Sequence, residues 1–143
     1  MANEYSKENV WKIMEDSKTV NFIRAIGLPD RKNIKIDIET YTAIDGEASQ
    51  ELVDELHILR QDMTRRTAKT LKKLDVTAEE LKCGLSDEKA VKQVSEYLHK
   101  YDGVIVSYGT CAVISDINKI AMEFQIPLVE NNQFDMKKMT KKW

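Results

Sequence analysis

The chain has 143 residues, which is the size of one domain and is enough to bury about two-thirds of the unfolded surface. Its composition, 42% hydrophobic and 32% charged, excludes a disordered or low-complexity chain. A formal net charge of −2 argues against a protein that binds nucleic acid or membrane over its whole surface. No apolar run approaches the ~18 residues of a membrane span, and the N-terminus lacks the basic-then-apolar pattern of a signal peptide, so we expect a cytoplasmic protein.

The first part of the chain is expected to form a helical segment and then a strand. The apolar content of residues 19–27 fits a strand as well as a helix. Gly27 followed by Pro29 is a helix stop signal, so the helix is preferred there and residues 1–30 are predicted as the helical N-terminal segment of a single domain spanning 1–143. Isoleucine then alternates with charged residues, which predicts a strand with one exposed face over residues 34–41.

The longest predicted element is one amphipathic helix over residues 47–74. Apolar residues recur there every three or four positions, which is the period of a helix with one buried face. This face would consist of Leu52, Leu56, Leu59, Met63, Thr67, Leu71 and Leu74. The stripe is narrow enough for a partner helix, so we expect a homo-oligomer built on this helix, with acidic and basic halves selecting antiparallel pairing.

The C-terminal half is expected to contain two helices, a crossover unit and a tail. Thr77 with Glu80 forms a capping box, which begins a pair of helices over residues 77–100. Residues 102–131 follow the order strand, turn, helix, strand, which is the parallel crossover unit, right-handed in roughly 98% of cases. Residues 132–143 are expected to form a tail.

These elements predict an α/β fold, a small domain of the three-layer type that is rich in helices. Its sheet is expected to be short, with about three strands and a right-handed β-α-β crossover at the C-terminal end. The strands would come from Lys35–Tyr41, Val104–Ser107 and Leu128–Glu130.

The first candidate site is the turn that follows the strand of residues 104–107. In open parallel sheets, ligands collect at the carboxyl ends of strands, and the N-terminus of the next helix attracts anions. Gly109 would let the backbone approach a ligand. The turn consists of Ser107, Tyr108, Gly109, Thr110 and Cys111. The alternative is that the turn binds no ligand, so that Gly109 only allows the backbone to turn and Thr110 only caps the next helix.

Because no complete catalytic set is present, the leading interpretation is a small intracellular binding protein without catalytic activity or cofactor. It would recognise an anionic small ligand or a protein partner through this turn. A zinc site is not expected, since the two cysteines and two histidines share no ligand spacing.

The second candidate site is the strand segment Ile36-Asp37-Ile38-Glu39-Thr40. An Asp-x-Glu pattern on a strand places two carboxylates on one face, where a nuclease could hold divalent ions. This segment resembles the first motif of proofreading-type 3′–5′ exonucleases, and residues 132–135 resemble their second motif. The resemblance implies a metal-dependent nuclease with Asp37, Glu39 and Asp135 as ligands for Mg²⁺ or Mn²⁺. The third motif of that family has no counterpart, and a solvated strand face explains the pattern without a metal.

A third candidate site is the basic second half of the helix predicted over residues 47–74, which could bind the phosphate groups of a nucleic acid. Its basic residues are Arg60, Arg65, Arg66, Lys69, Lys72 and Lys73. The order of acid first and base last is also what the helix dipole favours. Nucleic acid is therefore the less favoured partner.

Overall fold

The computed structural model describes residues 19–28, 31–42, 51–107 and 112–135, and within them it has a five-stranded mixed sheet in the order β3-β2-β1-β4-β5. The first three strands form an antiparallel meander, β4 pairs parallel with β1, and β5 pairs parallel with β4. The strands are β1 (Thr19–Leu28), β2 (Arg31–Thr42), β3 (Leu52–Leu59), β4 (Val104–Ser107) and β5 (Gln133–Asp135).

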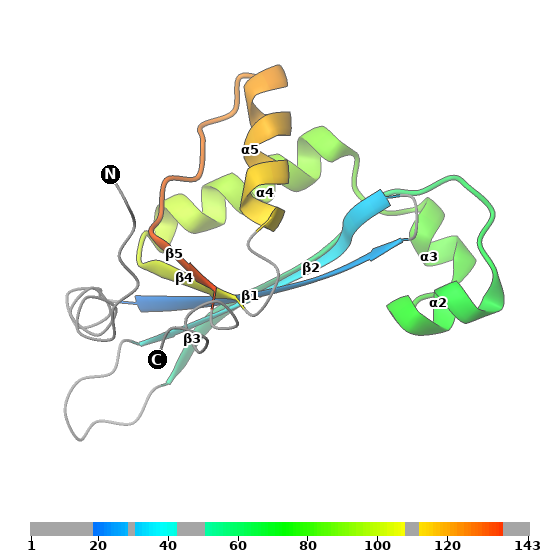
Figure 1. Cartoon of the computed structure of the whole chain (residues 1–143), viewed down its shortest axis with the longest axis horizontal. Coiled ribbons are helices and arrows are strands. Elements are labelled where there is room, and N and C mark those ends of the chain that lie inside the picture. Colours follow the sequence, from blue (N-terminus) through cyan, green and yellow to red (C-terminus); the bar gives the residue numbers. More distant parts are fainter. Residues whose placement is uncertain (1–18, 29–30, 43–50, 108–111, 136–143) are drawn as a thin grey trace.

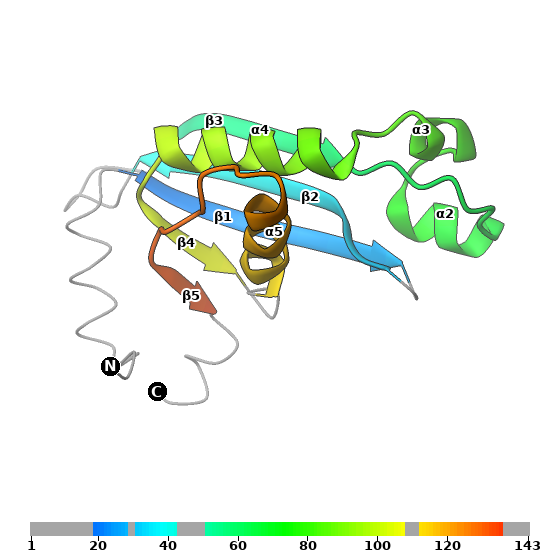
Figure 2. The same ribbon diagram turned by 90° about the horizontal axis from the view of Figure 1, so that it is seen from above.

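Four helices are present in the described part of the chain. They are α2 (Ala68–Leu74), α3 (Ala78–Lys82), α4 (Asp87–Lys100) and α5 (Ala112–Glu123). The longer helices α4 and α5 lie over the same face of the sheet, whereas α2 and α3 lie beyond one end of the meander (Figures 1 and 2). Over the described ranges, no helix is long and apolar enough to cross a bilayer.

The main core lies between the sheet and these two longer helices. Alternation along β2 turns its isoleucines toward α4, and the spacing of apolar residues in α4 presents one stripe back to the sheet. Burial of each isoleucine or leucine stabilises the fold by about 1.5–3 kcal/mol. The buried residues include Ile23, Ile36, Ile38, Ile58, Val91, Val94, Leu98, Ile105, Ile114 and Ile117.

A buried polar network crosses this core. Thr40 Oγ1 donates to Asn21 Oδ1 at 2.6 Å and lies 2.6 Å from the Tyr97 hydroxyl. The Asn21 amide donates to the carbonyl oxygens of Tyr101 at 3.0 Å and Gly103 at 3.3 Å. The network therefore joins β1, β2 and α4 to the turn that leads into β4, and it satisfies polar groups that would be costly to bury alone.

The prediction of a helix-rich domain with about three strands is wrong. One additional strand, β1, lies in the segment 1–30 that was predicted to be helical, and another, β3, lies in the predicted helix 47–74. Residues 1–18 lie outside the described residues. In the central strand β1, the polar residue Asn21 is 0% exposed and its apolar neighbour Phe22 is 38% exposed, so the sequence lacks the alternation of apolar and polar residues that marks a half-exposed strand.

The predicted helix 47–74 is wrong because residues 52–59 form the strand β3. Leu56 and Leu59, three positions apart, imitate helical spacing, but Leu56 packs against the main core and Leu59 packs against a separate cluster with Leu74 and Leu81. A β-bulge at Val53 interrupts the strand alternation further, since Asp54 pairs with Thr40 but Leu52 pairs with Tyr41. Among the described residues of the predicted range, only α2 is helical. The long helix through which we expected a homo-oligomer is therefore absent from these residues.

The C-terminal crossover has a different second strand from the one expected. The strand is β5, and the predicted strand Leu128–Glu130 is absent from the described elements. The Val129 N–H donates to Asn118 Oδ1 at 2.8 Å, and the Asn118 amide donates to the Val129 carbonyl at 3.0 Å. A side chain of α5 thus satisfies the backbone of this buried valine in place of a neighbouring strand.

Candidate functional site

The predicted ligand-binding turn is only partly described. Ser107 ends β4, is 5% exposed and pairs with Asp135 of β5. Tyr108, Gly109, Thr110 and Cys111 lie outside the described residues. Of the predicted ligand-binding turn, the structure therefore describes only Ser107, a buried residue at the carboxyl end of β4.

The three carboxylates of the alternative metal site lie on different parts of the sheet. Asp37 and Glu39 are on β2, whereas Asp135 is on β5, and β1 and β4 lie between these strands. Three strand spacings separate β2 from β5, roughly 14 Å at about 4.8 Å each. In the described residues no group of three or more His, Cys, Asp or Glu side chains is arranged to hold a metal ion. The structure does not bring the proposed ligands together.

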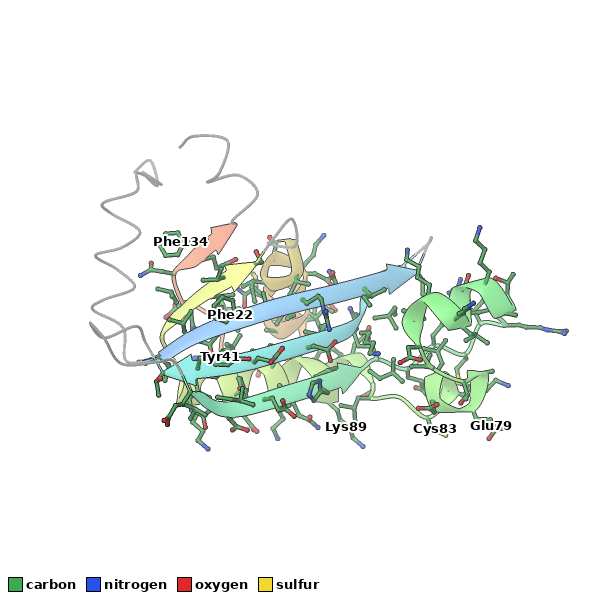
Figure 3. The ribbon with its side chains drawn as sticks, turned by 90° about the horizontal axis from the view of Figure 1, so that it is seen from below. Phe22, Tyr41, Glu79, Cys83, Lys89 and Phe134 are labelled. Carbon is green, nitrogen blue, oxygen red and sulfur yellow. The ribbon has the colours of Figure 1, made fainter. Side chains whose placement is uncertain are left out.

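Asp37 instead has cross-strand partners, and Glu39 has a partner on its own strand, on the sheet face opposite α4 and α5. His57 Nδ1 lies 2.7 Å from Asp37 Oδ1, and Arg24 is 3.9 Å from the same carboxylate. The Tyr41 hydroxyl donates to Glu39 at 2.8 Å. Figure 3 shows this face, with Phe22 and Tyr41 labelled on β1 and β2. Each predicted metal ligand on β2 thus has a protein partner already.

The described residues do form a groove at the end of the molecule that α2 and α3 occupy. Its volume is about 420 Å³, which is within the range of roughly 300–1,000 Å³ for ligand sites. The lining residues are Met63, Thr64, Arg65, Arg66, Leu71, Ala78, Leu81 and Lys82. Most of these side chains are exposed, and only Leu81 is buried, so the groove is shallow.

Two short helices form one side of the groove. Thr67 caps α2 by accepting from the Thr70 N–H at 3.2 Å, and Thr77 with Glu80 forms the capping box of α3. Between them Asp75 adopts a left-handed conformation with φ 56°, which ends α2 and turns the chain. The helices are fixed to the meander by a second apolar cluster, made of Leu28, Ile34, Leu74 and Leu81.

The other side of the groove is the segment that follows β3. Asp62, 5% exposed, donates its N–H to the Leu81 carbonyl at 3.0 Å and accepts from Arg66 Nε at 2.7 Å. The hydrogen bond from Arg66 holds the pKa of Asp62 below its ordinary value. The backbone N–H of Asp62 therefore fixes the segment against α3, and its carboxylate holds the guanidinium of Arg66.

The lining of the groove combines apolar and basic side chains. Its apolar side chains include Met63, which is 65% exposed, with Leu71 and Leu81, and its basic ones include the exposed Arg65 and Lys82. Basic side chains outnumber acidic ones over residues 63–82, although the whole chain has a formal charge of −2. The local charge favours an anionic ligand.

Sequence reasoning identified Arg65 and Arg66 as candidate phosphate contacts but placed them on a continuous helix. The groove exists because the chain turns after β3 and again at Asp75, and these turns depend on tertiary contacts. Comparison with protein-family models finds no match to the chain, and comparison with curated proteins finds none either.

Proposed function

We propose that the protein is a non-catalytic binding protein that holds an acidic segment of a partner protein in the groove between the segment after β3 and the helices α2 and α3. The observation that carries this proposal is that apolar and basic side chains line the same groove. An apolar side chain of the partner would pack against Met63 and Leu71, and carboxylates of the partner would form ion pairs with Arg65 and Lys82. Methionine suits such a surface because its flexible thioether adapts to different side chains.

The shape of the groove favours a peptide over an enclosed small molecule. Sites for small ligands bury 70–90% or more of the ligand, whereas most side chains that line this groove are exposed. An extended or helical segment needs only one open side. The turn at residues 107–111 has no part in this proposal.

The groove is less suited to single-stranded nucleic acid. Proteins that bind single strands stack bases on aromatic side chains, and none of the described residues that line the groove is aromatic. The exposed ring of Phe22, with Tyr41 beside it, belongs to a different face of the protein.

Fluorescence anisotropy with three short labelled probes tests the proposal. They are a peptide of glutamates and leucines, the same peptide with serine for leucine, and an oligothymidylate. The leucine peptide should bind tightest, and its affinity should fall as salt concentration rises because the rim charges are exposed. Tighter binding of the oligothymidylate, or binding of neither peptide, would contradict the proposal.

Variants locate the binding to the groove. Arg65→Glu combined with Lys82→Glu should weaken binding of the leucine peptide roughly tenfold or more, since exposed ion pairs contribute up to about 1 kcal/mol each. Met63→Ser should remove the preference for leucine over serine. Lys119→Glu, an exposed position on α5, makes the same charge change away from the groove and should leave binding unchanged. Equal losses in Lys119→Glu would place the binding elsewhere.

A further inference from the structure

The strand β3 is an edge of the sheet. Among the described residues it pairs with β2 alone, apart from a bridge between Arg60 and Leu85 just beyond its end. Two of its apolar side chains, Leu52 and Val53, are 51% and 45% exposed. An edge with exposed apolar side chains is a surface on which another strand can add.

Hydrogen bonds at the end of β3 determine which backbone groups point outward. The Arg60 N–H donates inward to the Ile34 carbonyl at 2.8 Å, whereas the Leu59 carbonyl accepts outward from the Leu85 N–H at 2.8 Å. Because these directions alternate along a strand, Glu55 and His57 present their N–H and C=O groups outward, as Leu59 does. The intervening Leu56 directs its backbone groups toward β2.

We propose that two copies of the chain join through β3 as an antiparallel pair in which Leu56 lies opposite its own counterpart. The sheet would then continue across the two copies, with Glu55 of each opposite His57 of the other. Two neighbouring registers also keep the faces aligned, and they would place Glu55 opposite Glu55 or His57 opposite His57. Like charges directly opposite destabilise a strand pair and opposite charges stabilise it, so charge selects the first register.

The proposed pair also explains the exposed apolar side chains at the start of β3. Antiparallel pairing brings the beginning of one strand beside the end of the other, where the outward carbonyl of Leu59 already accepts from Leu85. The strand pairing would therefore cover residues 54–58, and Leu52 and Val53 of each copy would pack against Leu85 of the second copy. A symmetric two-copy contact is the commonest form of assembly.

Two contacts limit the strength of this association. The bond from the Leu85 N–H to the Leu59 carbonyl shortens the pairing, and a second contact occupies the edge at Glu55. The Glu55 N–H donates to Asp54 Oδ1 at 2.8 Å, so a side chain already occupies one outward group of the edge. Pairing exchanges this hydrogen bond for one to the His57 carbonyl of the second copy. The association is therefore weak and depends on protein concentration.

Sedimentation velocity of the full chain over a wide concentration range tests the proposal. The mass should rise from 16.5 kDa toward twice that value with concentration. Glu55→Lys should weaken the pair at least tenfold because it places a cation opposite His57 on both sides of the dyad. Glu123→Lys, which makes the same charge change on α5, should not. A monomer at every concentration, or equal effects of the two variants, would overturn the proposal.

Cysteine cross-linking tests the register directly. Opposed residues without mutual hydrogen bonds have Cα atoms about 4.5 Å apart, within the range that a disulfide spans. In a background of Cys83→Ser and Cys111→Ser, Leu56→Cys should oxidise to a disulfide-linked dimer and Glu55→Cys should not. Cross-linking through Glu55→Cys alone would show the register with Glu55 opposite Glu55 and overturn the proposed one. Circular dichroism of each variant shows whether the fold is intact.

Discussion

His57 Nδ1 lies 2.7 Å from Asp37 Oδ1 across the β2–β3 pair, and its Nε2 lies 3.4 Å from Glu55 Oε1. The ring thus stands between two carboxylates on the sheet face opposite α4 and α5. The hydrogen bond with Asp37, followed by that with Glu55, raises the pKa of His57 above its ordinary value of 6.5. Charged His57 is therefore favoured in the folded state.

The first prediction is that this histidine makes stability depend on pH. Because the folded pKa is raised, the stabilisation is fully present below about pH 6.5 and is lost as pH rises through the folded pKa. The effect should be below about 1 kcal/mol, since the side chain is 58% exposed and solvent screens the pair. An NMR titration should give a pKa above 6.5 for His57 that falls in Asp37→Asn. A pKa at or below 6.5 in the unmodified chain would contradict it.

The second prediction concerns Arg60, whose side chain is 6% exposed at the end of β3. Its guanidinium donates to Asp87 at 3.0 and 3.1 Å, to Asp116 at 3.1 Å and to the Asn33 carbonyl at 3.3 Å. Arg60→Met should lower the free energy of unfolding by about 2 kcal/mol. Removal of a buried partner can cost 3–5 kcal/mol, but both carboxylates are about one-third exposed and water can solvate them.

Urea unfolding measures this difference. Arg65→Met is the matched control, because Arg65 is exposed, and it should change the free energy of unfolding by less than about 0.5 kcal/mol. Equal effects of the two substitutions would show that the contacts of Arg60 contribute nothing specific.

Local signals in the sequence were informative where the chain forms short, exposed helices. The Thr77 and Glu80 side chains form a capping box in the structure, and Ser86 accepts from the Lys89 N–H at 3.3 Å at the start of α4. These signals act within one helical turn, so they can be read without knowledge of the fold. The same holds for the β-branched run that forms β4.

Long-range pairing was not visible in the sequence. The strand β1 could be recognised only once its neighbours β2 and β4 were known, and the spacing of Leu56 and Leu59, which pack against different clusters, disguised β3 as a helix. The candidate site was missed for the same reason. Met63 and Leu81 are eighteen positions apart and meet only because α2 and α3 fold back against the segment after β3. Asp37 and His57 are likewise joined only by strand register.

The third prediction concerns Gly103, which precedes β4. A Cβ atom at this position would overlap the backbone carbonyl group of Thr19, and backbone cannot move aside as a flexible side chain can. Gly103→Ala should therefore destabilise the fold by about 3 kcal/mol or more, at the upper end of the usual cost of overpacking. Thermal unfolding followed by circular dichroism measures the loss. Asp102→Ala, at the exposed neighbouring position, should change stability little, and a similar loss in both variants would contradict the steric explanation.

The fourth prediction is that Thr40 and Tyr97 act on stability as a coupled pair. Thr40→Val removes a hydroxyl that donates to Asn21 and contacts the Tyr97 hydroxyl, and it leaves two buried polar atoms without this partner. The expected cost is about 3 kcal/mol, since each unsatisfied buried group costs about 1–3 kcal/mol. Tyr97→Phe should cost only about 1 kcal/mol, because the bond from Thr40 to Asn21 remains. In the double variant the orphaned phenol is gone, so the total loss should be smaller than the sum of the two single losses. Urea denaturation of the four proteins measures this coupling, and strictly additive losses would show that the two hydroxyls do not interact.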